Sequence, residues 1–370
     1  MSEHTNGILS INRRKLLARL GGAAIAAPTV LRSACAQSPG KVVIASDSGL
    51  AQKAQTEVFF KPFTKETGIE VDVRSVLSLA QKKAMAETGK IEVDIVNHRG
   101  MDVTLMAKNK WLEPIDYSRF RKEDRDAIQP TDMTEYGFAV WYWAEVMAYR
   151  TDVFGKDVFP ADWTQFWDLK KFPGSRSLGD PSYSFSLEFA LLADGVPADK
   201  LYPLDIDRAL ASFTKIRDSV VAWWGKSAAQ PAQLINDKEI NLCAVAHTRI
   251  KEVVDSGAPV AVNWNRGMLY QAFYSVMKGA PNKDNAMKLM AYVARPENQA
   301  DHARYLPSGP TNSKAYSMLD DKVARSLPTF PENRARMFVK NDAWWASENA
   351  SGKTNRETVI DKWEAWKLKA

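Results

Sequence analysis

From residue 42 onwards, two hydrophobic patterns alternate along the chain. One is a short apolar run typical of a buried strand, and the other is a stretch in which apolar residues recur every three to four positions. The first kind of pattern predicts strands, in chain order, at 42–45, 69–73, 93–96, 176–178, 240–246, 260–262 and 274–277. The second kind predicts helices around 59–63, 101–106, 166–172, 184–193, 204–218, 233–235 and 286–293, with one more beginning at Pro296. Strands that alternate with helices in this way predict an α/β fold with mostly parallel sheets flanked by helices.

The first 36 residues follow neither pattern. A basic cluster, Asn12-Arg13-Arg14-Lys15, leads into an uncharged stretch over 20–31, and small residues at 33–36 precede Gln37. A basic, an apolar and a small-residue segment in this order make up an export signal, so we predict a cleaved signal over 1–36 and a periplasmic mature protein. The paired arginines and the interruption at Arg19 favour the twin-arginine route, with the general secretory route as the alternative.

A membrane anchor is the other interpretation of this segment. The residues 20–31, at about 1.5 Å each, would cover only about 18 Å, well short of the hydrocarbon core of a bilayer. No later stretch reaches the roughly 18 consecutive apolar residues that a membrane span needs. We therefore expect an exported chain rather than an anchored one.

Charge changes this picture little. The 370 residues contain 50 Lys and Arg against 44 Asp and Glu, a formal net charge of +6. Most of that surplus lies in the predicted signal, so the rest of the chain is close to neutral and we expect no nucleic-acid partner.

Sequence chemistry predicts no catalytic centre. Two cysteines and four histidines make neither a disulfide scaffold nor a multi-ligand metal site. Cys243 lies in the apolar strand at 240–246, where a buried core thiol is expected. The sequence has no Gly-rich phosphate loop, no G-x-S-x-G elbow and no H-E-x-x-H helix. We expect no enzyme activity, no cofactor and no metal, with a twin-arginine-exported enzyme as the alternative.

Five blocks of sequence resemble the periplasmic spermidine/putrescine-binding proteins of ABC importers, in the extracellular solute-binding family. They occur in the family's order and span nearly the whole mature chain. The blocks are FFKPFTKETGIEV at 59–71, WTQFWDLKKFPG at 163–174, QLINDKEINL at 233–242, KGAPNK at 278–283 and PSGPTN at 307–312.

The resemblance implies a two-lobe periplasmic-binding-protein fold of type II, with hinge crossings between the lobes. Lobe 1 would comprise 37–148 and 263–306, and lobe 2 would comprise 149–262 and 307–370. The resemblance also implies a monomer that captures a small solute in the cleft between the lobes. Its partners would be the permease subunits of an ABC transporter and their cytoplasmic ATPase.

In sheets of this kind, ligands bind at the carboxyl ends of the strands, where loops meet helix N-termini. The loops predicted there, with nearby strand positions, supply the candidate ligand contacts. These are Ser46, Asp47, Ser48, Arg99, Trp143, Asp180, Tyr183, Gln230, His247, Arg249, Trp264 and Tyr274.

These positions differ from the polyamine-binding pattern, in which carboxylates hold ammonium groups and aromatic rings line the methylene chain. Asp47 and Ser48 stand where the family has an aromatic residue after its first strand. Arg99 and Arg249 are suited to bind a carboxylate, phosphonate or sulfonate. With Asp47 or Asp180 opposite, the site would hold a zwitterion, such as an amino acid or an amino-alkyl acid.

Alternatives stay open for the arginines and for the ligand. The alternative for Arg99 is an ion pair with Asp94 or Asp102, and for Arg249 a solvated place in the first turn of a helix. Putrescine or spermidine, as in the family, is the alternative ligand. A ferric-ion receptor of the same fold is disfavoured, because Tyr305 has no adjacent tyrosine.

Overall fold

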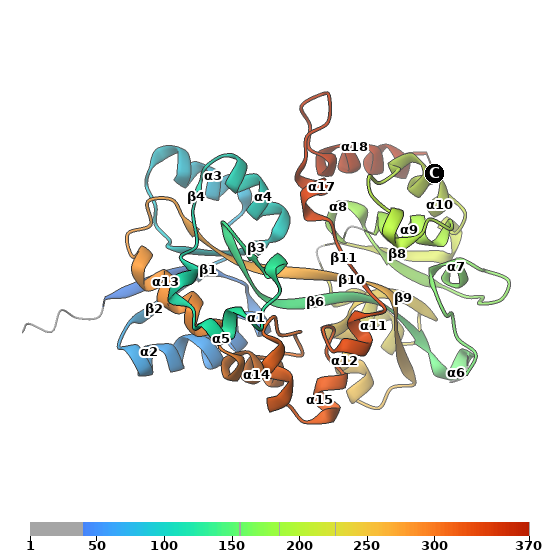
Figure 1. The fold of residues 1–370 in the computed structure, drawn as a ribbon. Coiled ribbons are helices and arrows are strands. Elements are labelled where there is room, and N and C mark those ends of the chain that lie inside the picture. The colour runs from blue at the N-terminus through green and yellow to red at the C-terminus, as the bar shows by residue number, and fades with distance from the viewer. Residues whose placement is uncertain (1–39, 155–156, 185, 226, 370) are drawn as a thin grey trace, which may run out of the picture. The chain divides into compact units, whose positions relative to one another are not determined.

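Two long strands run side by side through the middle of the sheet (Figure 1). β6 (Gly137–Arg150) and β10 (Val260–Met277) pair antiparallel, from Arg150 opposite Val260 at one end to Phe138 opposite Tyr274 at the other. β6 is buried along almost its whole length, as expected for an apolar run at the centre of a sheet. The computed structural model describes residues 40–154, 157–184, 186–225 and 227–369.

Three parallel strands lie on each side of this pair. The strand order is β2-β1-β3-β10-β6-β9-β7-β8, and β11 and β4 pair with β10 while β5 pairs with β6. β1, β2 and β3 run parallel, as do β7, β8 and β9, whereas β10 meets β3 and β6 meets β9 antiparallel. The bounds are β1 Lys41–Ser46, β2 Glu70–Ser75, β3 Ile95–Arg99, β4 Leu112–Glu113, β5 Met133–Thr134, β7 Arg176–Gly179, β8 Val220–Trp224, β9 Leu242–Ala246 and β11 Phe338–Val339.

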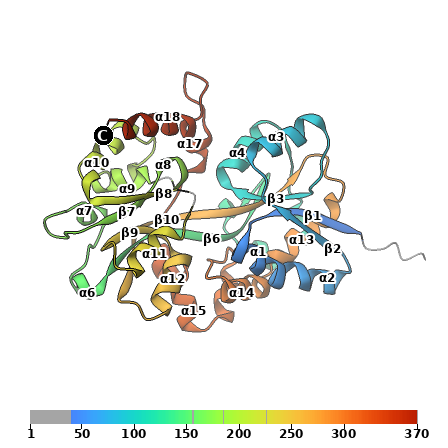
Figure 2. The ribbon, with the colours of Figure 1, turned by 180° about the vertical axis from the view of Figure 1, so that it is seen from behind.

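Helices cover both faces of the sheet (Figures 1 and 2). From behind, α11 and α12 lie against the sheet beside β9 (Figure 2). The α-helices are α1 Gly49–Gln55, α2 Lys61–Thr67, α3 Leu79–Thr88, α4 Gly100–Lys108, α5 Lys122–Arg125, α6 Thr151–Phe154, α7 Trp163–Phe166, α8 Pro181–Ser184, α9 Leu187–Ala193, α10 Ile206–Thr214, α11 Gln230–Asn236, α12 His247–Asp255, α13 Lys283–Val293, α14 Pro296–Tyr305, α15 Asp321–Arg325, α16 Pro331–Arg334, α17 Asp342–Ala346 and α18 Asn355–Lys367. A π-helical turn, Thr56–Phe60, joins α1 to α2, and 3₁₀ turns lie at Tyr117–Arg119, Pro130–Asp132, Ala198–Lys200, Arg217–Ser219 and Ser313–Met318.

Local sequence signals explain where several helices start and stop. α3 and α18 begin with capping boxes. The side-chain oxygens of Ser78 and Thr354 accept hydrogen bonds from the backbone N–H groups of Gln81 and Glu357. The side chains of Gln81 and Glu357 in turn accept from the backbone N–H groups of Ser78 and Thr354. α2 ends at Gly68, whose backbone is left-handed with φ 72°, a conformation that costs glycine little. These signals set the entry of α3 and α18, which both contribute to the site described below.

Separate hydrophobic clusters among the described residues stabilise the two halves of the sheet, and the largest of them lie beside β1 and β3 and beside β7 and β9. The core beside β1 and β3 contains Phe59, Phe63 and Tyr274, all fully buried. The core beside β7 and β9 contains Trp163 and Trp345, which are equally buried. Together the described residues form one compact α/β unit, and the predicted fold class, a large sheet flanked by helices, is confirmed.

Two predicted elements differ from the structure. The predicted strands at 260–262 and 274–277 are the two ends of β10, which runs on between them and has an irregularity in its register with β6 between Asn263 and Met268. The predicted helix at 166–172 is wrong: α7 ends at Phe166. Its continuation is blocked because the buried Arg176 guanidinium bonds the carbonyl oxygens of Phe166, Phe172 and Gly174.

Two predictions concern features that the structure leaves untested. The export signal at 1–36 lies outside the described residues, and the lobe boundaries stay a prediction. No helix in the described part of the chain is long and apolar enough to cross a membrane.

Candidate ligand-binding site

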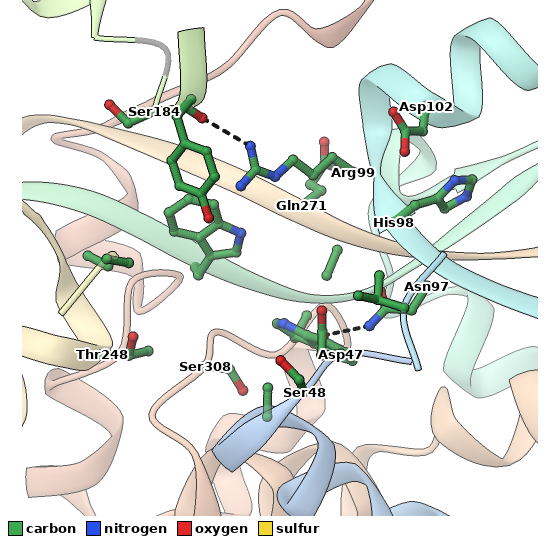
Figure 3. A pocket seen from close by; sticks show the side chains of 18 of the residues that line it. Asp47, Ser48, Asn97, His98, Arg99, Asp102, Ser184, Thr248, Gln271 and Ser308 are labelled. Carbon is green, nitrogen blue, oxygen red and sulfur yellow. Dashed lines mark hydrogen bonds between the residues drawn. The ribbon is translucent and has the colours of Figure 1, made fainter. Parts of the chain in front are cut away.

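A cleft of about 800 Å³ lies over β3, β6 and β10 at the middle of the sheet. It is lined by segments from both sides of β6 and β10, among them the ends of β1 and β3 and the short helix α8. Charged and polar groups converge on it (Figure 3). The polar lining residues are Asp47, Ser48, Ser78, Gln81, Lys82, Asn97, His98, Arg99, Asp102, Tyr183, Ser184, Thr248, Arg249, Glu252, Gln271, Ser308 and Arg356.

One end of the cleft carries a carboxylate held by amides. Asp47 follows β1, and its Oδ2 accepts hydrogen bonds from Asn97 Nδ2 at 2.6 Å and Gln55 Nε2 at 3.3 Å (Figure 3). Burial raises the pKa of Asp47, while the two amides and the charge of Arg99 oppose that rise. The carboxylate is therefore fixed in place by neutral donors, and a cationic group in the cleft would stabilise its charged form.

A buried layer orients these amides. Gln55 Oε1 accepts from the Ser46 hydroxyl at 2.7 Å and from the Tyr274 hydroxyl at 2.5 Å. With its oxygen occupied in this way, the Gln55 amide nitrogen points to Asp47. Ser46 and Tyr274 are both fully buried, so in this structure they support Asp47 from behind rather than line the cleft.

A second region of the cleft is built around a guanidinium group. Arg99 ends β3, and its Nη1 donates to the backbone carbonyl oxygen of Tyr183 in α8 at 3.3 Å (Figure 3). The guanidinium carbon lies 5.9 Å from the centre of the Trp143 ring and 5.6 Å from that of the Tyr183 ring, within the range of cation–π attraction. The alternative partners predicted for Arg99 have other contacts. Asp102 accepts from Lys82, and Asp94 accepts from the backbone N–H groups of Val43 and Asn282.

Trp143 is backed by a buried polar cluster. Its ring stacks on that of Tyr270, with centres 3.9 Å apart and planes 4° from parallel. The Tyr270 hydroxyl lies 2.8 Å from the Ser184 carbonyl oxygen and 3.0 Å from Glu145 Oε2. Burial raises the pKa of Glu145 to about 8, with a further contribution from the charge of Glu188.

A buried ion pair forms the adjoining wall. Lys82 is only 2% exposed, and its Nζ donates to Asp102 at 2.9 Å. Burial alone would raise the pKa of Asp102, but the charge and the hydrogen bond of Lys82 hold it below its usual value. His98 is neutral because burial lowers its pKa to about 3. Arg356, from the first turn of α18, lines the same wall, and burial lowers its pKa.

The opposite rim is more exposed. Arg249, the third residue of α12, keeps 41% of its side chain exposed and lies 3.7 Å from Glu252. His247 starts the same helix but is buried: the Ala144 N–H donates to its Nδ1 at 3.0 Å, and its Nε2 donates to the Pro307 carbonyl at 2.5 Å. Burial lowers the pKa of His247 to about 4, so this ring is a neutral strut.

The structure brings half of the twelve predicted ligand contacts to the cleft: Asp47, Ser48, Arg99, Trp143, Tyr183 and Arg249. Ser46, Tyr274 and His247 are buried behind it. Trp264 lies in β10 beside His247, Asp180 bonds the backbone N–H of Ser182, and Gln230 is exposed at the start of α11. Contact between any of these residues and a ligand stays a prediction.

Sequence reasoning missed several residues of the cleft. Gln55, Glu145 and Tyr270 act from behind it through side chains that no local pattern distinguishes from core polar residues. Asn97 directly precedes His98 and Arg99 at the end of a strand, and that position was the available signal. Arg356 lies far along the chain in α18, and nothing in its local sequence indicates a cleft residue.

The described residues contain no group of three or more His, Cys, Asp or Glu side chains that could hold a metal ion. The charged groups of the cleft instead form pairs and hydrogen bonds suited to small organic ions. The two features that stand out are the Asp47 carboxylate and the Arg99 guanidinium, reached from the same cavity.

Residues 59–331 match the bacterial extracellular solute-binding protein family, and the chain belongs to that family. The gamma-aminobutyric acid-binding protein of Pseudomonas aeruginosa is 30% identical over 340 residues, 90% of this chain and 92% of that protein. The spermidine/putrescine-binding periplasmic protein of Escherichia coli is 26% identical, over 76% of this chain and 81% of its own.

Solved structures agree with this assignment. The crystal structure of an ABC transporter substrate-binding protein from Bradyrhizobium japonicum has a TM-score of 0.79 and 32% identity, covering 88% of this chain and 99% of that one. The chain is thus a solute-binding protein of ABC transport, as the resemblance predicted. Members of this class bind small ligands and work with permease and ATPase components, and the relatives named here are binding proteins rather than enzymes.

Proposed function

We propose that this protein binds a small zwitterion with separated acidic and amino groups, an amino-alkyl acid of which 4-aminobutyrate is the simplest probe. The single observation that carries the proposal is the placement of the Asp47 carboxylate and the Arg99 guanidinium group on one cleft. Arg99 would bind the carboxylate through its planar fork, and Asp47 would bind the ammonium group. The name of the Pseudomonas aeruginosa relative, a gamma-aminobutyric acid-binding protein, supports this class of ligand.

A polyamine suits the charges of the cleft less well. Of the lining carboxylates, Asp102 is bound by Lys82 and Glu252 lies near Arg249, whereas Asp47 is held by amides. A di- or polycation could place one ammonium group against the Asp47 carboxylate, but its second ammonium group would then lie towards Arg99. Like charges brought together in a closed cleft cost several kcal/mol, roughly, and so exclude the wrong ligand.

The biological setting is part of the same proposal. We infer a monomeric periplasmic protein without catalytic activity, exported by the signal at 1–36 through the twin-arginine route. It would deliver its ligand to a permease and would have no nucleic-acid partner. The membership of an extracellular solute-binding family and the small, paired-charge cleft support this setting.

Calorimetric titration of the purified mature protein tests the ligand class. We expect 4-aminobutyrate to bind, and butyrate and butylamine, which each lack one charged end, to bind far more weakly. Putrescine is the matched dication, because it replaces the carboxylate by a second ammonium group. Tight putrescine binding with no response to 4-aminobutyrate would refute the proposal and restore the polyamine alternative.

A further inference from the structure

One hydroxyl group behind the cleft wall faces two oxygen acceptors. A tyrosine hydroxyl has a single hydrogen to donate. The Tyr270 hydroxyl lies 2.8 Å from the Ser184 carbonyl oxygen and 3.0 Å from Glu145 Oε2. If Glu145 were ionised, one of these two short contacts would join oxygens with no hydrogen between them. A neutral Glu145 that donates to Tyr270 satisfies both contacts at once.

The surroundings of Glu145 favour the same state. The side chain is fully buried in β6, and its Oε1 has no hydrogen-bond partner among the described residues. An unsatisfied buried oxygen costs more free energy on an ionised carboxylate than on a neutral carboxylic acid. The titratable and charged groups that face Glu145 come from the elements packed around it: Tyr270 of β10, Arg99 of β3, Glu188 of α9, Cys243 of β9 and, at the backbone of Ala144, His247 of α12.

We propose that Glu145 is a positioning residue of the ligand site, a neutral carboxylic acid that donates to the Tyr270 hydroxyl and so leaves that hydroxyl to hold Ser184. This inference rests on the proposed function, because it takes Arg99 and Trp143 as ligand contacts. Glu145 itself does not line the cleft.

The geometry links Glu145 to both of those contacts. The Tyr270 ring stacks beneath Trp143, so the hydrogen bond that fixes the Tyr270 ring also fixes this wall. The Tyr270 hydroxyl holds the carbonyl of Ser184, and the preceding residue, Tyr183, presents the carbonyl that orients Arg99. One buried proton therefore fixes the support of the guanidinium group and its aromatic neighbour.

Loss of that proton would disturb the site in two ways. The Glu145 carboxylate would take the Tyr270 hydrogen bond away from Ser184, and its charge would attract Arg99 away from the ligand. Burial raises the pKa of Glu145 to about 8, so the effect belongs to mildly alkaline solution. Ligand affinity should then fall around pH 8. Neither the guanidinium group nor the ligand carboxylate changes its protonation state at that pH, so the fall would report on Glu145.

The test is titration with 4-aminobutyrate over a series of pH values from about 6 to 9.5, in the wild type, Glu145→Gln and Tyr270→Phe. For the wild type we expect constant affinity up to about pH 7 and a loss of several-fold to about tenfold by pH 9. Glu145→Gln keeps a neutral donor, so it should match the wild type at pH 7 and stay constant at higher pH. Tyr270→Phe should bind more weakly at pH 7 and should also lack the alkaline loss.

Glu188→Gln is the matched control. Glu188 is equally buried, but its Oε1 accepts from Tyr202 and Trp345 rather than from Tyr270. This variant should keep the alkaline loss of affinity, moved to lower pH, because removing the charge of Glu188 lowers the pKa of Glu145. Wild-type affinity that is independent of pH, or an alkaline loss retained in Glu145→Gln, overturns the inference.

An infrared measurement separates this inference from the ligand proposal. The carbonyl stretch of a protonated carboxyl group should be present at pH 7 in the ligand-free wild type and diminished in Glu145→Gln. If 4-aminobutyrate fails to bind but this band behaves as expected, the ligand proposal fails while the neutral state of Glu145 stands. If the difference band is missing, Glu145 is ionised and the inference is wrong whatever the ligand.

Discussion

The two charged ends of the cleft are built differently. Asp47 is held by the amides of Asn97 and Gln55, a small set of neutral donors. Arg99 is surrounded by aromatic rings, a helix-end carbonyl and, further back, buried carboxyl groups. The guanidinium end is therefore supported by stacked rings and buried carboxyl groups, whereas the carboxylate end is supported by neutral amides, one of which two buried hydroxyl groups orient.

Removal of the Arg99 guanidinium group should have the largest effect. In Arg99→Ala the ligand carboxylate loses a charge-assisted partner, so we expect affinity for 4-aminobutyrate to fall about 100-fold or more, roughly 3 kcal/mol. Calorimetric titration measures it. Arg99→Lys retains a charge but not the fork, and should recover only part of the loss. Unchanged affinity in Arg99→Ala would mean that the carboxylate binds elsewhere.

Neutralising the carboxylate end should cost less and should change selectivity. Asp47→Asn keeps the shape and removes the charge, so we expect a loss of about tenfold for 4-aminobutyrate. The same variant should bind butyrate as well as the wild type does, because butyrate has no ammonium group. A parallel loss for butyrate would show that Asp47 acts on the fold of the cleft and not on the ammonium group.

Two buried groups behind the cleft, His302 and Glu145, should make stability respond to opposite changes of pH. Burial lowers the pKa of His302, which bonds the cleft residue Ser308, to about 3. Below about pH 6.5 His302 therefore binds a proton in the unfolded chain but not in the native state, and stability is lost as the pH falls. Glu145 has a raised pKa, so its native state keeps a proton that the unfolded chain releases, and stability is lost as pH rises from about 4.5 to 8.

Denaturant unfolding at several pH values measures both limbs. Each proton changes the unfolding free energy by at most about 1.4 kcal/mol per pH unit. The stability difference between His302→Gln and the wild type should vary only below about pH 6.5. The difference for Glu145→Gln should grow in the mutant's favour from about pH 4.5 to 8. If the stability difference between each variant and the wild type stayed constant over its pH range, these assignments would be wrong.

The aromatic wall should contribute moderately. Trp143→Leu keeps an apolar side chain but removes the ring beside Arg99 and its stack on Tyr270, so we expect an affinity loss of about fivefold, roughly 1 kcal/mol. Trp264→Leu is the matched control, because that ring lies beside His247 outside the cleft lining and should leave affinity unchanged. Equal losses in the two variants would point to a general effect of tryptophan removal.

The smallest effect is expected at the exposed rim. Arg249 shares the cleft with Arg99, but its half-exposed side chain near Glu252 is screened by solvent. We expect Arg249→Ala to change affinity by less than about threefold. A loss as large as that of Arg99→Ala would show that the ligand carboxylate is bound between the two arginines.

Much of the fold follows from local sequence, because apolar periodicity and capping residues act within one element. Pro296 marks the start of a helix, as predicted, and Gly68, a residue suited to a left-handed C-cap, ends another. The joining of 260–262 to 274–277 was not predictable in this way, because β6, a distant partner, supplies the register. The end of α7 depends on Arg176, ten residues beyond it, whose contacts no periodicity reports.

The cleft residues show the same difference between what local sequence predicts and what distant contacts decide. Asp47, Ser48 and Arg99 follow directly after predicted strands, where the topology alone places ligand groups, and the structure brings them together. Ser46 is the last residue of β1 and Tyr274 lies in β10, but both side chains are buried, because a one-residue step along a strand decides which face a side chain takes. Burial of that kind depends on how the whole sheet packs.

The continuity of β10 has a consequence for the order in which the molecule assembles. Its residues pair with partners in β6 that lie more than 100 positions earlier in the chain. Until β10 is in place, β3 and β6 each present an open edge of unpaired backbone groups, which invites association with other chains. Pairing across such a distance is slow compared with local contacts, so we expect the binding cleft to form late in folding. A fragment that stops before Val260 would have neither a cleft floor nor protected edges, and we expect it to aggregate.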